Sequence, residues 1–303
     1  MVDLSIIIPT KDRGEIFNQT YYALINAISG INAEIIIVND SKVPLNIKTS
    51  KETLILQNYK GGVAAGRNLG ALKASGKKLL FLDDDMLLDS KILKRLLQVN
   101  VRESEIVMPN WSYSYDSLAK ISKSSFGRFL IRYNWVSLKG WSNSEEWNDH
   151  AIFKTSGGAS YCLLISKAKF EEIGGYNESF PFAGFEDFDF IQRAKGAGIS
   201  FYIDPIATII HNEIDRTSLG SFLDRRERNA FTQKVAVNLG YQNLKISYEF
   251  VKRILIYFFD KCYPLIYFGA RNFPNIKGLD FAYFFLVKIL IVVKIFRGYN
   301  HDR

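Results

Sequence analysis

The sequence lacks several features that secreted and disulfide-bonded proteins need. Only two of its 303 residues are cysteines, and both, Cys162 and Cys262, stand inside apolar stretches. Two such residues form no metal-ligand pair and favour a reducing compartment. The chain opens with Met1-Val2-Asp3-Leu4, without a basic segment or a cleavage site. These absences predict a cytoplasmic protein, or one held on the cytoplasmic face of the plasma membrane.

Long uncharged apolar runs are also missing, although the C-terminal third is rich in Phe, Tyr, Ile and Leu. Residues 250–268 and 280–296 are both interrupted by charged side chains. A membrane-spanning helix needs about 20 largely uncharged residues, so neither stretch is expected to span. We expect residues 246–297 to form interfacial helices on an anionic membrane surface. Packing of these helices against the rest of the protein is the alternative.

The sequence has no RNA-binding signature and no Lys/Arg-rich stripe in its first two hundred residues, so we expect no nucleic acid partner. The formal charge is nevertheless +8, which predicts an affinity for anions such as nucleotide phosphates. With 48% hydrophobic and 23% charged residues, the composition is that of a globular protein with an ample core. No internal repeat or low-complexity segment interrupts it.

Short apolar, β-branched runs alternate with helical patterns through the first half of the chain. The predicted strands are residues 4–10, 34–40, 53–56 and 78–83, and the predicted helices between them are residues 15–28 and 63–74. Such alternation predicts an α/β fold with a mostly parallel sheet flanked by helices. Ligands of these sheets bind beyond the carboxyl ends of the strands.

Three polar clusters are expected at that edge of the sheet: Thr10-Lys11-Asp12-Arg13, Asp40-Ser41 and Asp83-Asp84-Asp85. Three acids at the end of a buried strand repel one another unless a cation lies among them. A hard divalent cation with a phosphate co-ligand meets that need. The alternative is a polar turn before the helix near Asp89.

Residues 111–147 contain all four tryptophans and many serines, and they predict a loop-rich excursion. Packing of most of these aromatic rings onto the domain is one interpretation. The other is an acceptor platform, because sugar rings stack on aromatic faces, and Trp141 is the candidate for such a contact.

The chain resembles the family 2 glycosyltransferases, inverting enzymes with a GT-A fold that use nucleotide-activated sugars. The matching motifs span residues 4 to 213 in family order, and such ordered co-occurrence is more specific than any single motif. They are Ser5-Ile6-Ile7-Ile8-Pro9-Thr10, Ile36-Ile37-Val38-Asn39-Asp40-Ser41, Gly62 to Gly70, Leu80 to Asp85, Gly157-Gly158-Ala159, Gly174-Gly175-Tyr176 and Phe185-Glu186-Asp187. A Gln-x-x-Arg-Trp motif is missing from the sequence, which argues against a processive, polymer-extruding role.

The resemblance implies roles for the residues that match its motifs. It places Thr10, Asp12 and Asp40 against the nucleoside, although the residues alone would fit Asp40 to a turn that closes its strand. Arg67 would contact phosphate from a Gly-flanked helix start, or be an ordinary surface arginine. In the Asp-x-Asp pattern, Asp85 would coordinate Mn²⁺ or Mg²⁺ and Asp83 would touch ribose or the metal.

Further roles concern the neighbouring acids and a histidine. Asp84 is grouped with the nucleotide-sugar-binding residues, although strand alternation points it the other way. His211, after an apolar run, is the expected further metal ligand, and a structural role is its alternative. Asp187 is the expected catalytic base, with Asp189 as the competing candidate. Glu186 would position the acceptor.

These assignments predict a GT-A domain over residues 1–240, with a nucleotide-binding half at 1–110 and an acceptor half at 111–240. Residues 241–303 would form a helical, membrane-associating extension. The predicted reaction moves a sugar from a nucleotide-sugar, most often a UDP-sugar in this family, to a hydroxyl of a glycan or lipid-linked saccharide. The rival interpretations are a non-catalytic sugar-nucleotide-binding subunit and a sugar nucleotidyltransferase. The nucleotidyltransferase interpretation is disfavoured, because this sequence lacks the Gly-rich, basic loop that such an enzyme has after its first strand.

Overall fold

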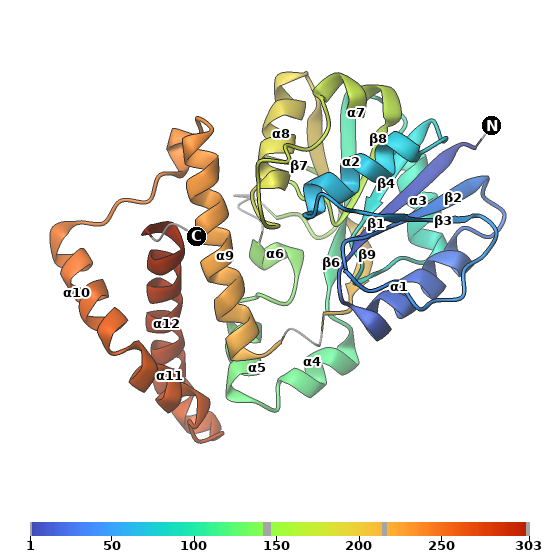
Figure 1. The fold of residues 1–303 in the computed structure, drawn as a ribbon. Helices are drawn as coiled ribbons and strands as arrows, with labels where there is room; N and C mark the ends of the chain where they lie inside the picture. The colour runs from blue at the N-terminus through green and yellow to red at the C-terminus, as the bar shows by residue number, and fades with distance from the viewer. Residues whose placement is uncertain (1, 142–146, 214–216, 301–303) are drawn as a thin grey trace. The chain divides into compact units, whose positions relative to one another are not determined.

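The computed structural model describes residues 2–141, 147–213 and 217–300 (Figure 1). The chain forms two compact units: Met1–Ser114 with Ser137–Asn212, and Tyr115–Val136 with Glu213–Arg303. The sequence predicts a boundary at residue 240. By contacts, the helix that precedes this residue groups with the C-terminal helices.

The first unit is built on a five-stranded sheet in the order β3-β2-β1-β4-β8. The first four strands are parallel, and β8 runs antiparallel to β4. The strands are β1 (Leu4–Thr10), β2 (Ala33–Asn39), β3 (Thr53–Gln57), β4 (Lys78–Leu82) and β8 (Cys162–Ser166). The four predicted strands are therefore confirmed to within two residues at each end, and so is the α/β class with a mostly parallel sheet.

Helices cover this sheet because its strands are apolar on both faces. All seven residues of β1 are buried. One core cluster joins Ile7, Ile36 and Phe81 of the sheet to buried residues of α2, α7 and α8. The helices of the unit are α1 (Gly14–Ala27), α2 (Val63–Lys73), α3 (Ser90–Val99), α6 (Leu138–Trp141), α7 (Lys167–Ile173) and α8 (Glu186–Gly196). The helices predicted at 15–28 and 63–74 are thus confirmed as α1 and α2.

The same unit contains a second, smaller sheet. Its long strand β9 (Ser200–His211) pairs in parallel with β6 (Glu105–Ser112), whose register shifts between Pro109 and Asn110. Two short strands run antiparallel to β9: β5 (Met86–Leu87) and β7 (Phe153–Thr155). The pairing of Met86 with His211 brings the end of the acidic triplet to the end of β9.

The second unit is helical. Its helices are α4 (Tyr115–Ile121), α5 (Ser125–Arg132), α9 (Leu219–Asn238), α10 (Phe250–Lys261), α11 (Tyr263–Arg271) and α12 (Asp280–Asn300). The expectation of a loop over residues 111–147 was therefore wrong for α4 and α5. Serine 124 caps α5 by accepting a hydrogen bond from the backbone N–H of Gly127 at 2.9 Å, a signal available in the sequence.

Helices α9 and α12 run side by side in Figure 1. They approach closely at Gly298, where an added Cβ would lie 2.0 Å from the carbonyl oxygen of Glu227. Only glycine permits that approach. Across the described residues, none of the helices combines the length and the apolar character that crossing a membrane requires.

Candidate functional site

The predicted polar clusters lie where parallel strands of the first unit end. β1 ends at Thr10, β2 at Asn39 and β4 at Leu82, so the residues that follow these strands meet at one edge of the sheet. The Thr10 hydroxyl donates to the carboxylate of Asp84 at 2.7 Å, which joins the first cluster to the third. Asp84 thus faces β1, away from the partners of Asp83.

The Asp40 carboxylate is held by the glycine turn that precedes α2. Asn58 donates to it at 2.8 Å, the backbone N–H of Gly62 at 3.0 Å, and the exposed Lys11 at 2.9 Å. Gly62 has φ +92, a left-handed conformation that suits glycine. Asp12 also has a positive φ, of 53, and accepts a hydrogen bond from Ser41. Asp12 is therefore tied to the residue that follows Asp40, at the edge expected to receive a nucleoside.

Arg67 lies at the centre of an acidic network. Its side chain is 3% exposed and donates from Nη2 to Asp83 at 2.9 Å. From Nη1 it donates to Glu186 and to Asp187, each at 3.0 Å. Three carboxylates from segments as much as 120 residues away thus share one guanidinium. The interpretation of Arg67 as an ordinary surface arginine was wrong.

Asp187 is the second residue of α8 and the more accessible acid of its pair. Its side chain is 19% exposed, whereas that of Glu186 is 1% exposed. Both carboxylate oxygens of Asp187 accept from Ser160, one from the hydroxyl at 2.6 Å and one from the backbone N–H at 3.2 Å. Glu186 instead accepts from the backbone N–H of Gly184. Asp187 therefore combines a fixed orientation with access to solvent.

The competing acid, Asp189, lies in a different setting. It is buried and accepts two hydrogen bonds from Arg193, at 2.7 and 2.9 Å, one turn further along α8. That pair stabilises the helix as an i,i+4 contact. The geometry favours Asp187 over Asp189 for contact with a substrate.

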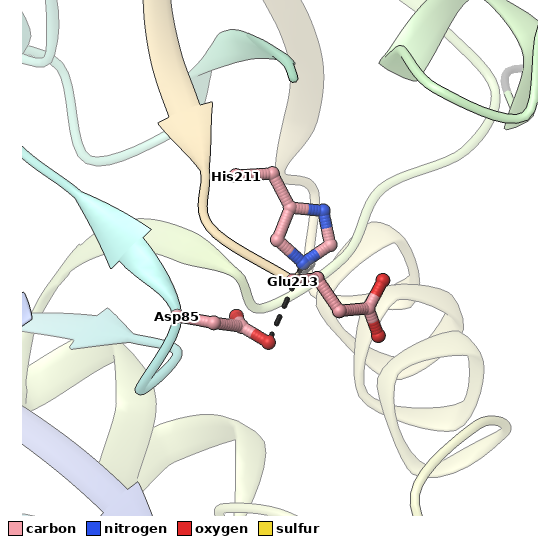
Figure 2. Close-up of side chains that lie close together, drawn as sticks. All are labelled: Asp85, His211 and Glu213. Carbon is pink, nitrogen blue, oxygen red and sulfur yellow. Dashed lines mark ion pairs between the residues drawn. The ribbon is translucent and has the colours of Figure 1, made fainter. Parts of the chain in front are cut away.

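Asp85 and His211 lie together at the other end of the triplet. His211 Nε2 is 3.4 Å from Asp85 Oδ2, the ion pair drawn in Figure 2. Trp111 and Tyr113 meet the imidazole edge-on, with ring centroids 4.8 and 5.6 Å away. Glu213 follows two residues later, and ligand atoms of Asp85, His211 and Glu213 all lie within 4.8 Å of one another. Two carboxylates and an imidazole are a ligand set that suits Mn²⁺, and the carboxylates also suit Mg²⁺.

Asp85 also has a cation of its own. Arg13 is buried and donates to Asp85 at 2.7 Å from Nη2, while its Nε lies 3.8 Å from Asp84. The charge repulsion within the triplet is therefore reduced by two arginines, Arg13 and Arg67. Among the described residues the candidate metal-binding group leaves out Asp83, which faces Arg67 instead.

Burial and mutual charge repulsion raise the pKa values of three acids of this site. Burial, followed by the nearby charge of Asp85, raises the pKa of Asp84 to about 7. Burial and the neighbouring Asp187 raise the pKa of Glu186 to about 7. Burial also raises the pKa of Asp83, against the opposing effect of Arg67. Burial disfavours the charge of Arg67, but Asp187 and Asp83 outweigh it and hold its pKa well above the ordinary value.

Several residues of the site were not singled out from the sequence. Arg13 was part of a predicted cluster, yet nothing in the sequence marks it as the partner of Asp85. Ser160 follows the predicted Gly157-Gly158-Ala159 motif, which is the one signal that could have found it. Tyr176 also ends a predicted motif, and its hydroxyl hydrogen-bonds the Ser160 hydroxyl at 2.6 Å. The guanidinium carbon of Arg67 lies over the Tyr176 ring, 5.1 Å from the ring centroid.

The tryptophans have different environments. Trp111 is buried and packs against the His211 imidazole, which helps to hold that ring in position. Trp147 packs on Phe153 with ring centroids 5.1 Å apart. Trp141 ends α6 and is 38% exposed, so it stays the candidate for contact with an acceptor.

Comparison with known proteins adds an independent line of evidence. The sequence model described as glycosyl transferase family 2 matches residues 5–173, which include the five-stranded sheet except for Leu4, the first residue of β1. A second model, described as the N-terminal domain of galactosyltransferase, matches residues 150–214.

Individual relatives agree with these matches. The low-salt glycan biosynthesis hexosyltransferase Agl10 of Haloferax volcanii is 25% identical over 261 residues, covering 80% of this chain and 81% of that protein. An uncharacterized glycosyltransferase of Haemophilus influenzae is 29% identical over 194 residues, 63% of this chain and 61% of that one.

A solved structure is similar in fold. The crystal structure of GalNAc-T7 with UDP, GalNAc and Mn²⁺ superposes with a TM-score of 0.50 and 13% identity. The match covers 81% of this chain and 53% of that chain. At that identity it supports the GT-A architecture alone.

Proposed function

The chain belongs to glycosyl transferase family 2, and from that premise we propose that it is an inverting, metal-dependent enzyme of glycan assembly. The observation that carries this proposal is the Arg67 network. It brings the expected base, Asp187, to the first acid of the Asp-x-Asp pattern, Asp83. A base next to a donor-binding carboxylate is what single-displacement sugar transfer requires.

In the proposed reaction Asp187 takes the proton of an acceptor hydroxyl. The hydroxyl oxygen attacks the anomeric carbon of the sugar from the face opposite the nucleoside diphosphate. The new glycosidic bond forms as the bond to the diphosphate oxygen breaks, and the electron pair leaves with the diphosphate. One displacement gives inverted configuration without a covalent enzyme intermediate. Ser160 orients Asp187 through both carboxylate oxygens.

The donor is proposed to lie at the edge formed by Thr10, Asp12 and Asp40, with a UDP-sugar as the first candidate. Asp85 and His211 would hold Mn²⁺ or Mg²⁺, and Glu213, whose carboxylate lies near both, would be a further ligand. A bound metal supplies positive charge that offsets the charge developing on the leaving diphosphate. Arg13 lies against Asp85 and would hold this carboxylate in position.

A nucleotide-sugar panel tests the proposal without knowledge of the acceptor. Each donor is assayed for slow hydrolysis and for thermal shift, with manganese, with magnesium and with EDTA. We expect hydrolysis of one donor class that depends on metal. Donor binding without hydrolysis of any donor would instead support a non-catalytic sugar-nucleotide-binding subunit.

The base is tested by Asp187→Asn, which keeps the size of the side chain but cannot take the proton. We expect turnover to fall by about 10²–10⁴, with donor affinity unchanged. Asp189→Asn is the matched control, because Asp189 is two residues away and pairs with Arg193. Loss in the control with normal activity in Asp187→Asn would assign the base to Asp189.

We also propose that the second unit binds an anionic membrane surface, where a lipid-linked saccharide acceptor would be found. The charge of the chain is concentrated there. This unit contains 19 Lys and Arg against nine Asp and Glu, whereas the first unit contains 20 against 22. Large apolar side chains are also exposed on α10, α11 and α12, among them Phe250, Phe258, Leu265 and Phe281.

Vesicle flotation tests this second proposal. We expect the full chain to float with phosphatidylglycerol-containing vesicles and to dissociate at high salt, since attraction between exposed charges is screened. Recovery with purely zwitterionic vesicles at the same level would contradict the role of charge. No recovery with either vesicle would favour a cytoplasmic protein whose C-terminal helices only pack together.

A further inference from the structure

The helical unit contains a hollow of about 400 Å³ between the end of α5 and one face of α12. Its lining consists of two cations and four aromatic residues. They are Arg132, Tyr133, Phe281, Phe284, Phe285 and Lys288. An aromatic floor with a cationic rim can bind a molecule that is apolar at one end and anionic at the other.

The lining residues of α12 form a second apolar face on that helix. Phe281, Phe284, Phe285 and Lys288 follow i, i+3, i+4 and i+7 spacing, which places them on one side. The opposite side holds buried residues of the unit's core: Tyr283, Val287, Leu290 and Val293. Phe281 is 75% exposed and Phe285 is 63% exposed. A helix that is apolar on two sides needs a partner for the uncovered one.

The cations of the hollow differ from other cations of the unit. Arg128 donates to Asp280 through two nitrogens, each at 2.7 Å, and Lys294 pairs with Glu227 at 2.7 Å. In the described part of the chain, Arg132 and Lys288 form no ion pair. Lys288 lies over the Tyr133 ring instead, with Nζ 4.5 Å from its centroid. Since Asp280 is neutralised by Arg128, the rim keeps two positive charges.

We propose that this hollow binds one anionic phospholipid of the membrane surface. Its phosphate would lie between Arg132 and Lys288, and the start of an acyl chain would lie along Phe281 and Phe285. Guanidinium and ammonium groups both bind phosphate oxygens, the first in bidentate geometry. The assignment rests on the proposed membrane association, and it gives that association a defined site as well as a general surface.

Titration with monomeric lipid tests the site apart from the membrane. Short-chain phosphatidylglycerol, below the concentration at which it aggregates, is added to the full chain in a calorimeter. We expect saturable one-to-one binding, weaker for phosphatidylcholine of the same chain length. Arg132→Gln with Lys288→Gln should weaken it by about twenty-five-fold, at about fivefold for each cation.

The matched control removes the same charge elsewhere in the unit. Lys252→Gln with Arg271→Gln changes two exposed cations of α10 and α11 that do not line the hollow. This pair should leave monomer binding unchanged. Phe285→Ser should weaken binding by about tenfold, while Phe250→Ser, at a still more exposed apolar position outside the hollow, should not. Circular dichroism of each variant confirms that it is folded.

Several outcomes would overturn the assignment. Absence of saturable binding, or equal losses in the two charge pairs, would leave only a diffuse basic surface. Displacement of the lipid by inorganic phosphate at similar concentration would indicate a simple anion site. Binding of farnesyl phosphate more than tenfold tighter would assign the hollow to a lipid-linked acceptor. Flotation of the full chain is scored separately, so membrane association can fail while the site stands, or the reverse.

Discussion

Replacing Arg67 by methionine should destabilise the fold more than any other single loss of charge in the first unit. Methionine fills a similar volume but supplies no hydrogen-bond donor. It would leave the carboxylates of Asp83, Glu186 and Asp187 without their shared cation. Because Arg67 and Glu186 are almost fully buried, water cannot replace the lost contacts.

The size of the effect follows from the cost of a buried charge without a partner. Breaking such a pair from one side destabilises by about 3–5 kcal/mol. Asp83 is 35% exposed, so water offsets part of its share and the lower half of that range is expected. With a urea dependence of about 1–3 kcal/mol per molar, the unfolding midpoint would fall by about 1–4 M.

The deficit should also depend on pH. Without Arg67, which lowers the pKa of both groups, Asp83 and Glu186 bind protons more readily, and protonation removes their charge repulsion. Urea unfolding at pH 7.5 and at pH 5.5 measures this, and the deficit should shrink at the lower pH. Arg102→Met is the control, because Arg102 forms an exposed i,i+3 pair with Glu105 and should cost less than about 1 kcal/mol. A loss in Arg67→Met that matches the control, or that is the same at both pH values, would refute this account.

Three further predictions concern the metal, the proton balance and a helix contact. Asp85→Ala should weaken calorimetric UDP binding in manganese at least tenfold while leaving the circular dichroism spectrum unchanged, and equal UDP affinity with EDTA would contradict a metal role. Asp84 and Glu186 hold protons in the folded state up to about pH 7, because their pKa values are raised above the ordinary ones. Metal-free protein in EDTA should therefore lose thermal stability as the pH rises from about 4 to 7. A melting temperature that rises over this window would be inconsistent with those pKa shifts. Gly298→Ala should cost about 1–3 kcal/mol in urea unfolding, because its Cβ would meet the backbone of Glu227, whereas Gly269→Ala, with no atom within 4 Å, should be neutral or slightly stabilising.

The main sheet could be predicted from the sequence because its central strands, β1, β2 and β4, are almost wholly buried. A strand such as β1 then shows a continuous apolar run that needs no partner to be recognised. The two-residue strand β5 has no such signal, since it exists only through its pairing with β9. Helices α4 and α5 were missed because aromatic and serine residues gave the segment the composition of a loop.

The sequence identified candidate residues for the site but not the side-chain contacts between them. Asp83, Asp85 and Asp187 stood out through ordered motifs. Arg67 and Asp187 are 120 residues apart in the sequence, and local sequence patterns do not indicate that two such distant residues pair. The same holds for Arg13 and Asp85, which are 72 residues apart.

The close contact between α9 and α12 has a consequence for how the chain is made. Gly298 lies against the backbone of α9, and Lys294 pairs with Asp224 and Glu227 on the same helix. Helix α9 therefore obtains part of its packing from residues that the ribosome adds well after α9 itself. A premature stop codon after Gly240 would leave buried positions of α9 such as Ala230 open to water. Such a truncation is expected to act as a folding defect that cellular quality control removes, even though every residue of the Arg67 network would still be present.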